Sequence, residues 1–281
     1  MNKRNEYQAG FTLIEAIMVM TITAILAAGV AVFLRTPVQG YFDLARRTAL
    51  SDSADTALRR ISRDLHLALP NSVRTVAGDE HCLEFLPTSS GGRYRADVGD
   101  TVAGNVFDTA SAIATLDVPG LLSAAPAAGD LLVIYNLGIA GADAYRRDNM
   151  GTVGAGSTSS AINLNPPKQF PFASPGNRFH LISGSEQAVF YVCSGIGVDA
   201  AGNGGGTLYR LSGYGINAAE PAACPAIPAN TPILAQNLSA CSFSYAGGVT
   251  ARSGLVSLRL AIRNDNETVN LYHEVHVSNV P

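Results

Sequence analysis

The residue of this sequence in the most unusual chemical setting is Glu15. It is the only charged residue between Phe11 and Leu34, and it follows Gly10 by five residues. A charged side chain at the centre of a membrane-inserted segment costs about 2.5–3.5 kcal/mol on insertion scales. A carboxylate retained in such a segment needs a physical reason, and that reason is the main clue to function.

Other residues with chemical potential do not form a recognisable site. His273 and His276 lie in an alternating, strand-like stretch, so their side chains point to opposite faces and cannot easily hold one ion. The glycine-rich run 202–206 lacks the Lys and Ser/Thr of a phosphate-binding loop, and it predicts a turn between strands. No Ser, Cys or carboxylate lies in a nucleophile motif, and the acidic residues are too sparse for an EF-hand loop. We therefore expect no catalytic residues, no metal site and no cofactor.

The apolar run from Phe11 to Leu34 is long enough to cross a membrane. As a helix it covers about 36 Å, against a hydrocarbon core of about 30 Å. A secretory signal peptide is one interpretation, because a basic leader precedes the run and the small residues 27–29 offer a cleavage site. A plain single-pass anchor is another. Neither interpretation explains Glu15 or the abrupt start of the run.

Residues 10–15 read G-F-T-L-I-E, between a basic leader and the apolar run, and this pattern resembles the N-terminus of type IV pilins and pseudopilins. The resemblance implies a leader peptide over residues 1–10, which prepilin peptidase removes between Gly10 and Phe11 on the cytoplasmic side. It also implies N-methylation of Phe11 and a transmembrane helix over residues 11–34. The protein is then expected in the inner membrane with its head in the periplasm, and later in a pilus filament at the cell surface.

The resemblance also implies an assembly role for Glu15. Cleavage creates a cationic amine on Phe11, and Glu15 of one subunit is expected to pair with that amine of a neighbour. In a helical bundle of low dielectric constant such a pair is stronger than at a surface, although desolvation offsets part of the gain. The alternative is that Glu15 reaches the membrane interface from its position near the helix end.

The helix is expected to continue beyond the apolar run as an amphipathic stretch over residues 35–70. Pro37 predicts a kink or a local loss of helix near residues 35–40. Apolar residues then recur at helical spacing: Leu50, Ala54, Ala57, Leu58, Ile61, Leu65, Ala68 and Leu69. Arginines occupy the other face, which we interpret as solvated and balanced by acids rather than as a lipid or nucleic-acid contact: Arg59, Arg60 and Arg63, with Asp43, Asp52, Asp55 and Asp64.

Residues 71–281 are predicted to form a single β-rich head. Short apolar runs, several of them alternating, indicate strands: 82–86, 131–137, 178–183, 188–193, 207–211, 241–245, 255–262 and 269–277. Segments 87–128 and 138–177 show weak periodicity and predict long loops or small inserted elements. The predicted fold class is α+β, and the resemblance to pilins implies that the long N-terminal helix packs on an antiparallel sheet of the same chain.

The four cysteines, Cys82, Cys193, Cys224 and Cys241, form no CxxC pair, which argues against a zinc site. In an oxidising periplasm two disulfides are expected. The positions along the chain favour Cys193–Cys224 and leave Cys82–Cys241, and buried free thiols are the alternative. The net charge of -3 provides no basic footprint, so nucleic acid is not an expected partner.

The tail strengthens the resemblance. Segments 207–210, 234–238, 243–245 and 275–281 resemble the large minor pilins of mannose-sensitive haemagglutinin pili. The resemblance implies a minor pilin that enters or initiates a filament, with other pilins, prepilin peptidase, the inner-membrane assembly platform and membrane lipid as partners. A J-type pseudopilin of type II secretion is the near alternative. A membrane-anchored periplasmic enzyme or binding protein, with its site in segment 87–177, is the alternative from another class.

Overall fold

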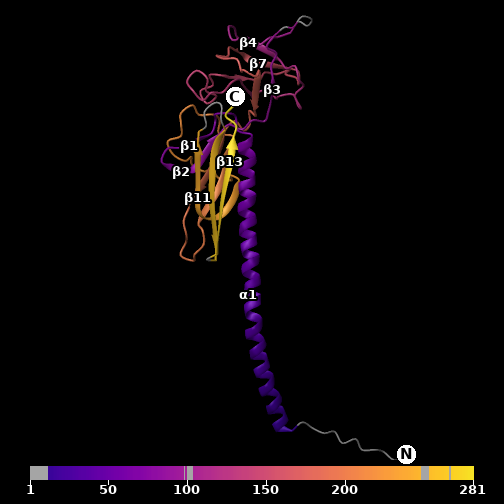
Figure 1. Ribbon diagram of the computed structural model, residues 1–281, viewed down its shortest axis with the longest axis vertical. Coiled ribbons are helices and arrows are strands. Elements are labelled where there is room, and N and C mark those ends of the chain that lie inside the picture. Colours follow the sequence, from indigo (N-terminus) through magenta and orange to yellow (C-terminus); the bar gives the residue numbers. More distant parts are fainter. Residues whose placement is uncertain (1–11, 98, 100–103, 248–252, 266) are drawn as a thin grey trace, which may run out of the picture. The chain divides into compact units, whose positions relative to one another are not determined.

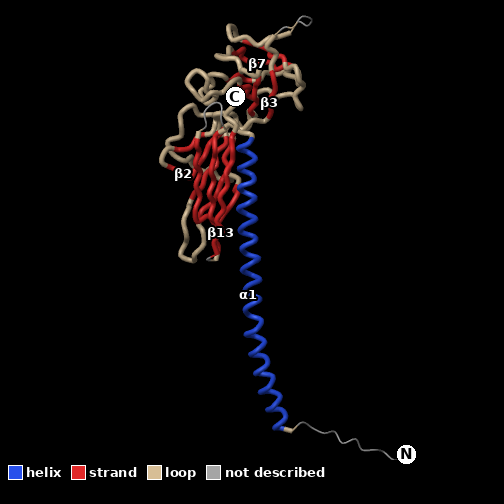
Figure 2. Tube along the Cα trace, in the orientation of Figure 1, coloured by secondary structure: helices blue, strands red, loops and turns tan. Residues whose placement is uncertain are grey.

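The computed structural model describes residues 12–97, 99, 104–247, 253–265 and 267–281. The chain divides into two compact units, Met1–Ala49 and Leu50–Pro281. Helix α1 (Leu13–His66) supplies the described part of the first unit and the start of the second. The strands all belong to the second unit and pair antiparallel, so the fold is α+β as predicted (Figures 1 and 2).

The part of α1 within the second unit covers the sheet with one apolar stripe. The predicted stripe is confirmed, because every residue assigned to it from Leu50 to Leu69 is buried. Its side chains meet Leu258, Leu260 and Val275 of the sheet in one core cluster. A turn follows His66, in which the amides of residues 67 and 68 bond back to Asp64 and Leu65. The helix therefore ends shortly before the expected Pro70.

Two expectations about this helix were wrong, one of them in part. Of the kink or local loss of helix expected at Pro37, the loss does not occur, since α1 is continuous through residues 35–40. A proline removes one backbone hydrogen bond, which a long helix can lose without ending. Asp64 is not on a solvated face: its side chain is 9% exposed, because it pairs with Arg210 of the sheet. The exposed pair Asp55–Arg59 follows the prediction, with 2.6 Å between Oδ2 and Nε.

The largest sheet has seven strands in the order β1-β2-β9-β10-β11-β12-β13. Each lies in or overlaps a predicted run, except the short β1. Their bounds are β1 Arg74–Val76, β2 Asp79–Phe85, β9 Val189–Ser194, β10 Gly206–Ser212, β11 Ile233–Ala246, β12 Gly254–Asn264 and β13 Glu267–Val277. The predicted turn over 202–206 lies in the connection from β9 to β10. A Cβ atom on Gly204 would lie 2.1 Å from the backbone oxygen of Asn237, so the close approach of the two backbones requires glycine there.

The segments without clear periodicity contain small inserted elements around separate cores. A four-stranded sheet has the order β3-β8-β5-β6, and a two-stranded sheet pairs β4 with β7. Their bounds are β3 Ser90–Arg93, β4 Ile113–Asp117, β5 Leu131–Val133, β6 Met150–Thr152, β7 Ala161–Lys168 and β8 Arg178–Ile182. Phe107, Leu116, Phe170 and Phe179 are among the buried residues of one such core. These sheets lie within the same compact unit as the large sheet.

All four cysteines form disulfides, but the favoured pairing was wrong. The bridges are Cys82–Cys224 and Cys193–Cys241. Successive side chains of a strand point to opposite faces of the sheet. Cys193 of β9 faces the core under α1, together with Cys241, whereas Cys82 of β2 faces the opposite side, where Cys224 packs. Strand alternation therefore separates Cys193 from Cys224.

Candidate functional site

The first turn of α1 holds Glu15, the carboxylate on which the assembly prediction depends. Thr12 caps the helix, because its hydroxyl oxygen accepts a hydrogen bond from the Glu15 amide at 3.3 Å, and its carbonyl accepts one from the Ala16 amide at 3.2 Å. Thr12 and Glu15 are spaced as in a capping box, and an acid in the first turn is favoured by the helix dipole. The T-x-x-E spacing was a signal for this cap that the sequence analysis did not use.

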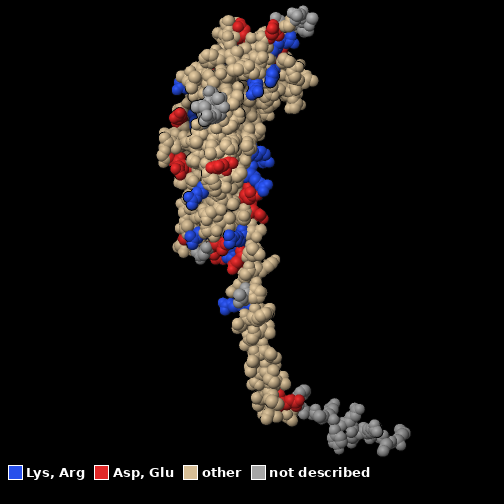
Figure 3. All heavy atoms as spheres, in the orientation of Figure 1, with Lys and Arg blue, Asp and Glu red and all other residues tan. Residues whose placement is uncertain are grey.

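The part of α1 from Leu13 to Leu34 presents apolar side chains on all sides. Large apolar residues along it are 51–79% exposed, among them Leu13, Ile25, Phe33 and Leu34. Figure 3 shows a long part of α1 with uncharged side chains alone on the visible face. Within the described residues, α1 is the one helix long and apolar enough to cross a membrane, and its most apolar part is not buried within the protein. Such a surface requires lipid or other helices around it.

The comparison with protein families bears on this end of the chain. Residues 6–31 match the model of the prokaryotic N-terminal methylation motif, the type IV prepilin leader. The chain carries this motif. No match was found among curated proteins or among solved structures.

The motif supports a type IV pilin-like or pseudopilin protein, which is a structural rather than an enzymatic class. It implies processing by prepilin peptidase and assembly with other pilins. Together with the exposed apolar helix, it indicates membrane anchoring of a globular head. The cleavage and methylation positions, Gly10 and Phe11, lie outside the described residues, so their predicted roles and the amine that would pair with Glu15 stay predictions.

A buried charge cluster joins α1 to the sheet of the head. Asp64 Oδ2 accepts hydrogen bonds from the Tyr191 hydroxyl and from Arg210 Nε, both at 2.7 Å. Arg60 Nε lies 3.1 Å from the other oxygen of Asp64, and Arg210 also reaches Glu186 at 2.7 Å. Burial lowers the pKa of Arg210, but its hydrogen bonds to Asp64 and Glu186 outweigh burial and raise that pKa overall. The cluster fixes which turn of α1 meets the sheet.

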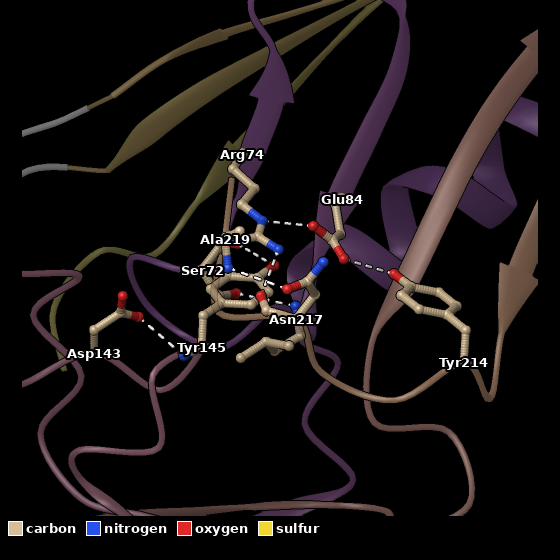
Figure 4. A network of polar contacts seen from close by, with 9 residues as sticks. Ser72, Arg74, Glu84, Asp143, Tyr145, Tyr214, Asn217 and Ala219 are labelled. Carbon is tan, nitrogen blue, oxygen red and sulfur yellow. Dashed lines mark hydrogen bonds and ion pairs between the residues drawn. The ribbon is translucent and has the colours of Figure 1, made fainter. Parts of the chain in front are cut away.

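A second buried network ties the inserted segment and a loop to the start of the large sheet (Figure 4). Arg74 of β1 pairs with Glu84 of β2, and its guanidinium lies 3.5 Å above the ring of Tyr145. The Tyr214 hydroxyl donates to the other oxygen of Glu84 at 2.8 Å, and Arg74 donates to the carbonyl of Asn217 at 2.9 Å. Burial, then the charge of Glu84, raises the pKa of Tyr145 and of Tyr214, so both phenols stay protonated.

In both networks the charged groups named above each contact an oppositely charged partner, so we assign both networks a role in holding the fold together. Most of their contacts join residues far apart in the sequence, which no local pattern marks, although Arg60 and Asp64 are an i,i+4 pair on α1. The two histidines of β13 behave as predicted, since His273 lies on the face towards α1 and His276 on the other. Asp79, Cys82 and Cys224 lie within 4.8 Å of one another, but a disulfide occupies both sulfurs and removes them as metal ligands.

Proposed function

We propose that this protein is a minor pilin, which enters or initiates a type IV pilus filament after cleavage between Gly10 and Phe11. The observation that carries the proposal is the methylation motif, which extends into a helix whose apolar side chains are exposed on all sides. In this proposal residues 1–10 are the leader, 11–34 the transmembrane helix, 35–70 its continuation and 71–281 the periplasmic head. The narrower likeness of the tail to the minor pilin MshO supports a pilus of the mannose-sensitive haemagglutinin type.

A J-type pseudopilin of type II secretion is the second candidate, and it has the same physical requirements. In both cases the protein waits in the inner membrane, and the assembly platform then moves it into a filament of other pilin or pseudopilin subunits. Mass spectrometry of the N-terminus tests the common part of the proposal. A start at methylated Phe11 is expected, whereas an intact Met1 or a start after Ala28 would favour the anchored periplasmic enzyme or binding protein.

The role proposed for Glu15 has its own test, which is the first prediction. Glu15→Gln keeps the size of the side chain and removes its charge, so the pair with the Phe11 amine of a neighbour is lost while the leader site stays intact. We expect normal cleavage but at least about tenfold fewer copies in sheared filaments, because loss of one such pair in an apolar bundle exceeds about 1.4 kcal/mol. The readout is quantitative immunoblotting of filament and membrane fractions.

Asp43→Asn is the matched control, because Asp43 is an exposed acid on the same helix beyond the apolar run. We expect this variant to enter filaments at the unmodified level. Incorporation of Glu15→Gln at that same level would show that the charge pair is not needed for entry into filaments.

A further inference from the structure

The two edges of the seven-stranded sheet differ in how they are protected. At one edge, β1 has three residues and its pairing with β2 shifts register between Thr75 and Val76. At the other edge, β13 has eleven residues and pairs with β12 without any shift. Short length and bulges are the usual means by which natural edges avoid pairing with other chains. By that measure β1 is protected and β13 is not.

β13 lacks the proline, lysine and bulge that commonly protect an edge strand, although Glu267 and Glu274 lie on it. Its sequence, ETVNLYHEVHV, contains no proline and no lysine. In the described part of the chain, β13 pairs with β12 alone. An edge strand of this kind presents a row of backbone N–H and C=O groups to any extended segment that approaches it.

A groove lies beside this edge, between β13 and the exposed side of α1. Its volume is about 570 Å³, and Arg59, Arg63, His66 and Leu67 of α1 and His273 of β13 are among the residues that line it. Arg63 and His66 are exposed, and Leu67 is 51% exposed. Figures 1 and 2 show β13 next to the end of α1, and Figure 3 shows positive side chains along α1 beside the head.

The charge of the groove is positive overall. Asp55 is its one acid, and Arg59 already pairs with it at 2.6 Å. From Val269 to Val277 the face of β13 towards α1 has no carboxylate, because Glu274 points to the other face, where it accepts a hydrogen bond from the Tyr272 hydroxyl. A strand added along β13 would therefore place those of its side chains that point towards α1 close to the arginines of the groove.

We propose that the β13 edge binds an extended segment of a neighbouring subunit, which adds a strand to the sheet and directs carboxylates towards Arg63 and His273. Strand addition supplies main-chain hydrogen bonds, and alternate side chains supply specificity. A second copy of this chain paired through its own β13 is disfavoured, because two positive grooves would then face each other. The inference deepens the proposed function, since it assigns the head a surface for a partner in the filament.

The test uses the full-length chain in non-ionic detergent micelles and a short peptide of alternating glutamate and valine. We expect saturable binding by fluorescence anisotropy and slower amide hydrogen exchange along β13. A lysine–valine peptide should bind at least about tenfold more weakly, since its charges repel those of the groove. The glutamate peptide with N-methylated amides should bind much more weakly, because its amides can no longer donate hydrogen bonds to the carbonyls of the strand edge.

Variants of the protein separate charge from folding. Arg63→Glu should weaken glutamate-peptide binding at least about tenfold, and Arg59→Glu with Arg63→Glu should reverse the preference towards the lysine peptide. Arg146→Glu is the matched control, because its side chain is 58% exposed and lies outside the groove. It should leave binding unchanged, and all three variants should keep the melting temperature of the unmodified head.

Three results would overturn the proposal. The first is no saturable binding of the glutamate peptide, or binding that N-methylation does not change. The second is protection of β13 by dioctanoyl phosphatidylglycerol and not by the peptide, which would make the groove a lipid headgroup site. The third is concentration-dependent dimerisation that protects β13 by itself. None of these results depends on cleavage at Gly10, so failure here is distinct from failure of the pilin proposal.

Discussion

Helix α1 contains two stretches that share one secondary structure and differ in what surrounds them. From Leu13 to Ala49 its large apolar residues are exposed, including Ile25 at 72% and Phe42 at 60%. From Leu50 to His66 the apolar residues form one stripe, and Ile61 and Leu65 in that stripe are fully buried. The second stretch is stabilised by the chain's own sheet. The first stretch has no such partner among the residues that the structure describes.

This difference assigns separate physical tasks to the two stretches. An apolar side chain of the second stretch contributes to the free energy of unfolding of the head, because it is buried when the head folds. An apolar side chain of the first stretch contributes to contact with lipid or with neighbouring helices, because those are the apolar surroundings open to it. Substitutions of the same chemical type in the two stretches should therefore give different measurements.

The largest expected effect is at Asp64, in the second stretch. Asp64→Ala leaves Arg210 and the Tyr191 hydroxyl without the carboxylate that they share, so the free energy of unfolding should fall by about 3–5 kcal/mol. The measurement is denaturant unfolding in micelles followed by tyrosine fluorescence, since the chain contains no tryptophan. Asp55→Ala is the matched control, because it removes an exposed acid–arginine pair of the same helix and should cost less than about 1 kcal/mol. Equal losses would show that the Asp64 cluster does not anchor the helix.

A smaller effect is expected from an apolar truncation. Ile61→Ala removes methyl groups from a fully buried position, so the free energy of unfolding should fall by about 2–4 kcal/mol. Ile25→Ala makes the same chemical change at an exposed position and should leave unfolding of the head unchanged, while it weakens retention in membranes or filaments. If Ile25→Ala destabilised the head as Ile61→Ala does, the two stretches would not have separate tasks.

Some features of the head could be predicted from the sequence, and others could not. The buried stripe, the strands and the opposite orientation of His273 and His276 follow from local periodicity, and the structure confirms them. Local patterns failed where a distant residue decides the outcome. Asp64 follows the charge pattern of a solvated face, yet Arg210 from β10 makes its burial possible.

The favoured disulfide pairing failed for the same reason. Which cysteine faces which core depends on the register of β2, β9 and β11, and single-chain periodicity does not specify register. Small inserted elements were among the expectations for residues 87–128 and 138–177, but the positions of their strands were not predicted. The strands within residues 87–128 and 138–177 are short, and their apolar residues meet partners from other parts of the chain. At the candidate site, the motif at residues 10–15 could be recognised because the proposed cleavage position and Glu15 lie close together in the sequence. The groove beside the β13 edge could not be predicted in this way, because β13 and α1 lie at opposite ends of the chain.

The smallest effect comes from exchanging glycine and alanine between the two stretches. Ala57 is 1% exposed, so Ala57→Gly loses helix propensity and a buried methyl group, and unfolding of the head should become easier by about 1–2 kcal/mol. Gly40 lies in the first stretch, where an added Cβ would meet nothing within 4 Å. Gly40→Ala should therefore stabilise α1 locally by about 0.5–1 kcal/mol, visible as slower amide exchange around residue 40, without moving the unfolding midpoint of the head. A shift of that midpoint by Gly40→Ala would mean that helix stability passes from the first stretch into the head, and the two stretches would then act as one cooperative element.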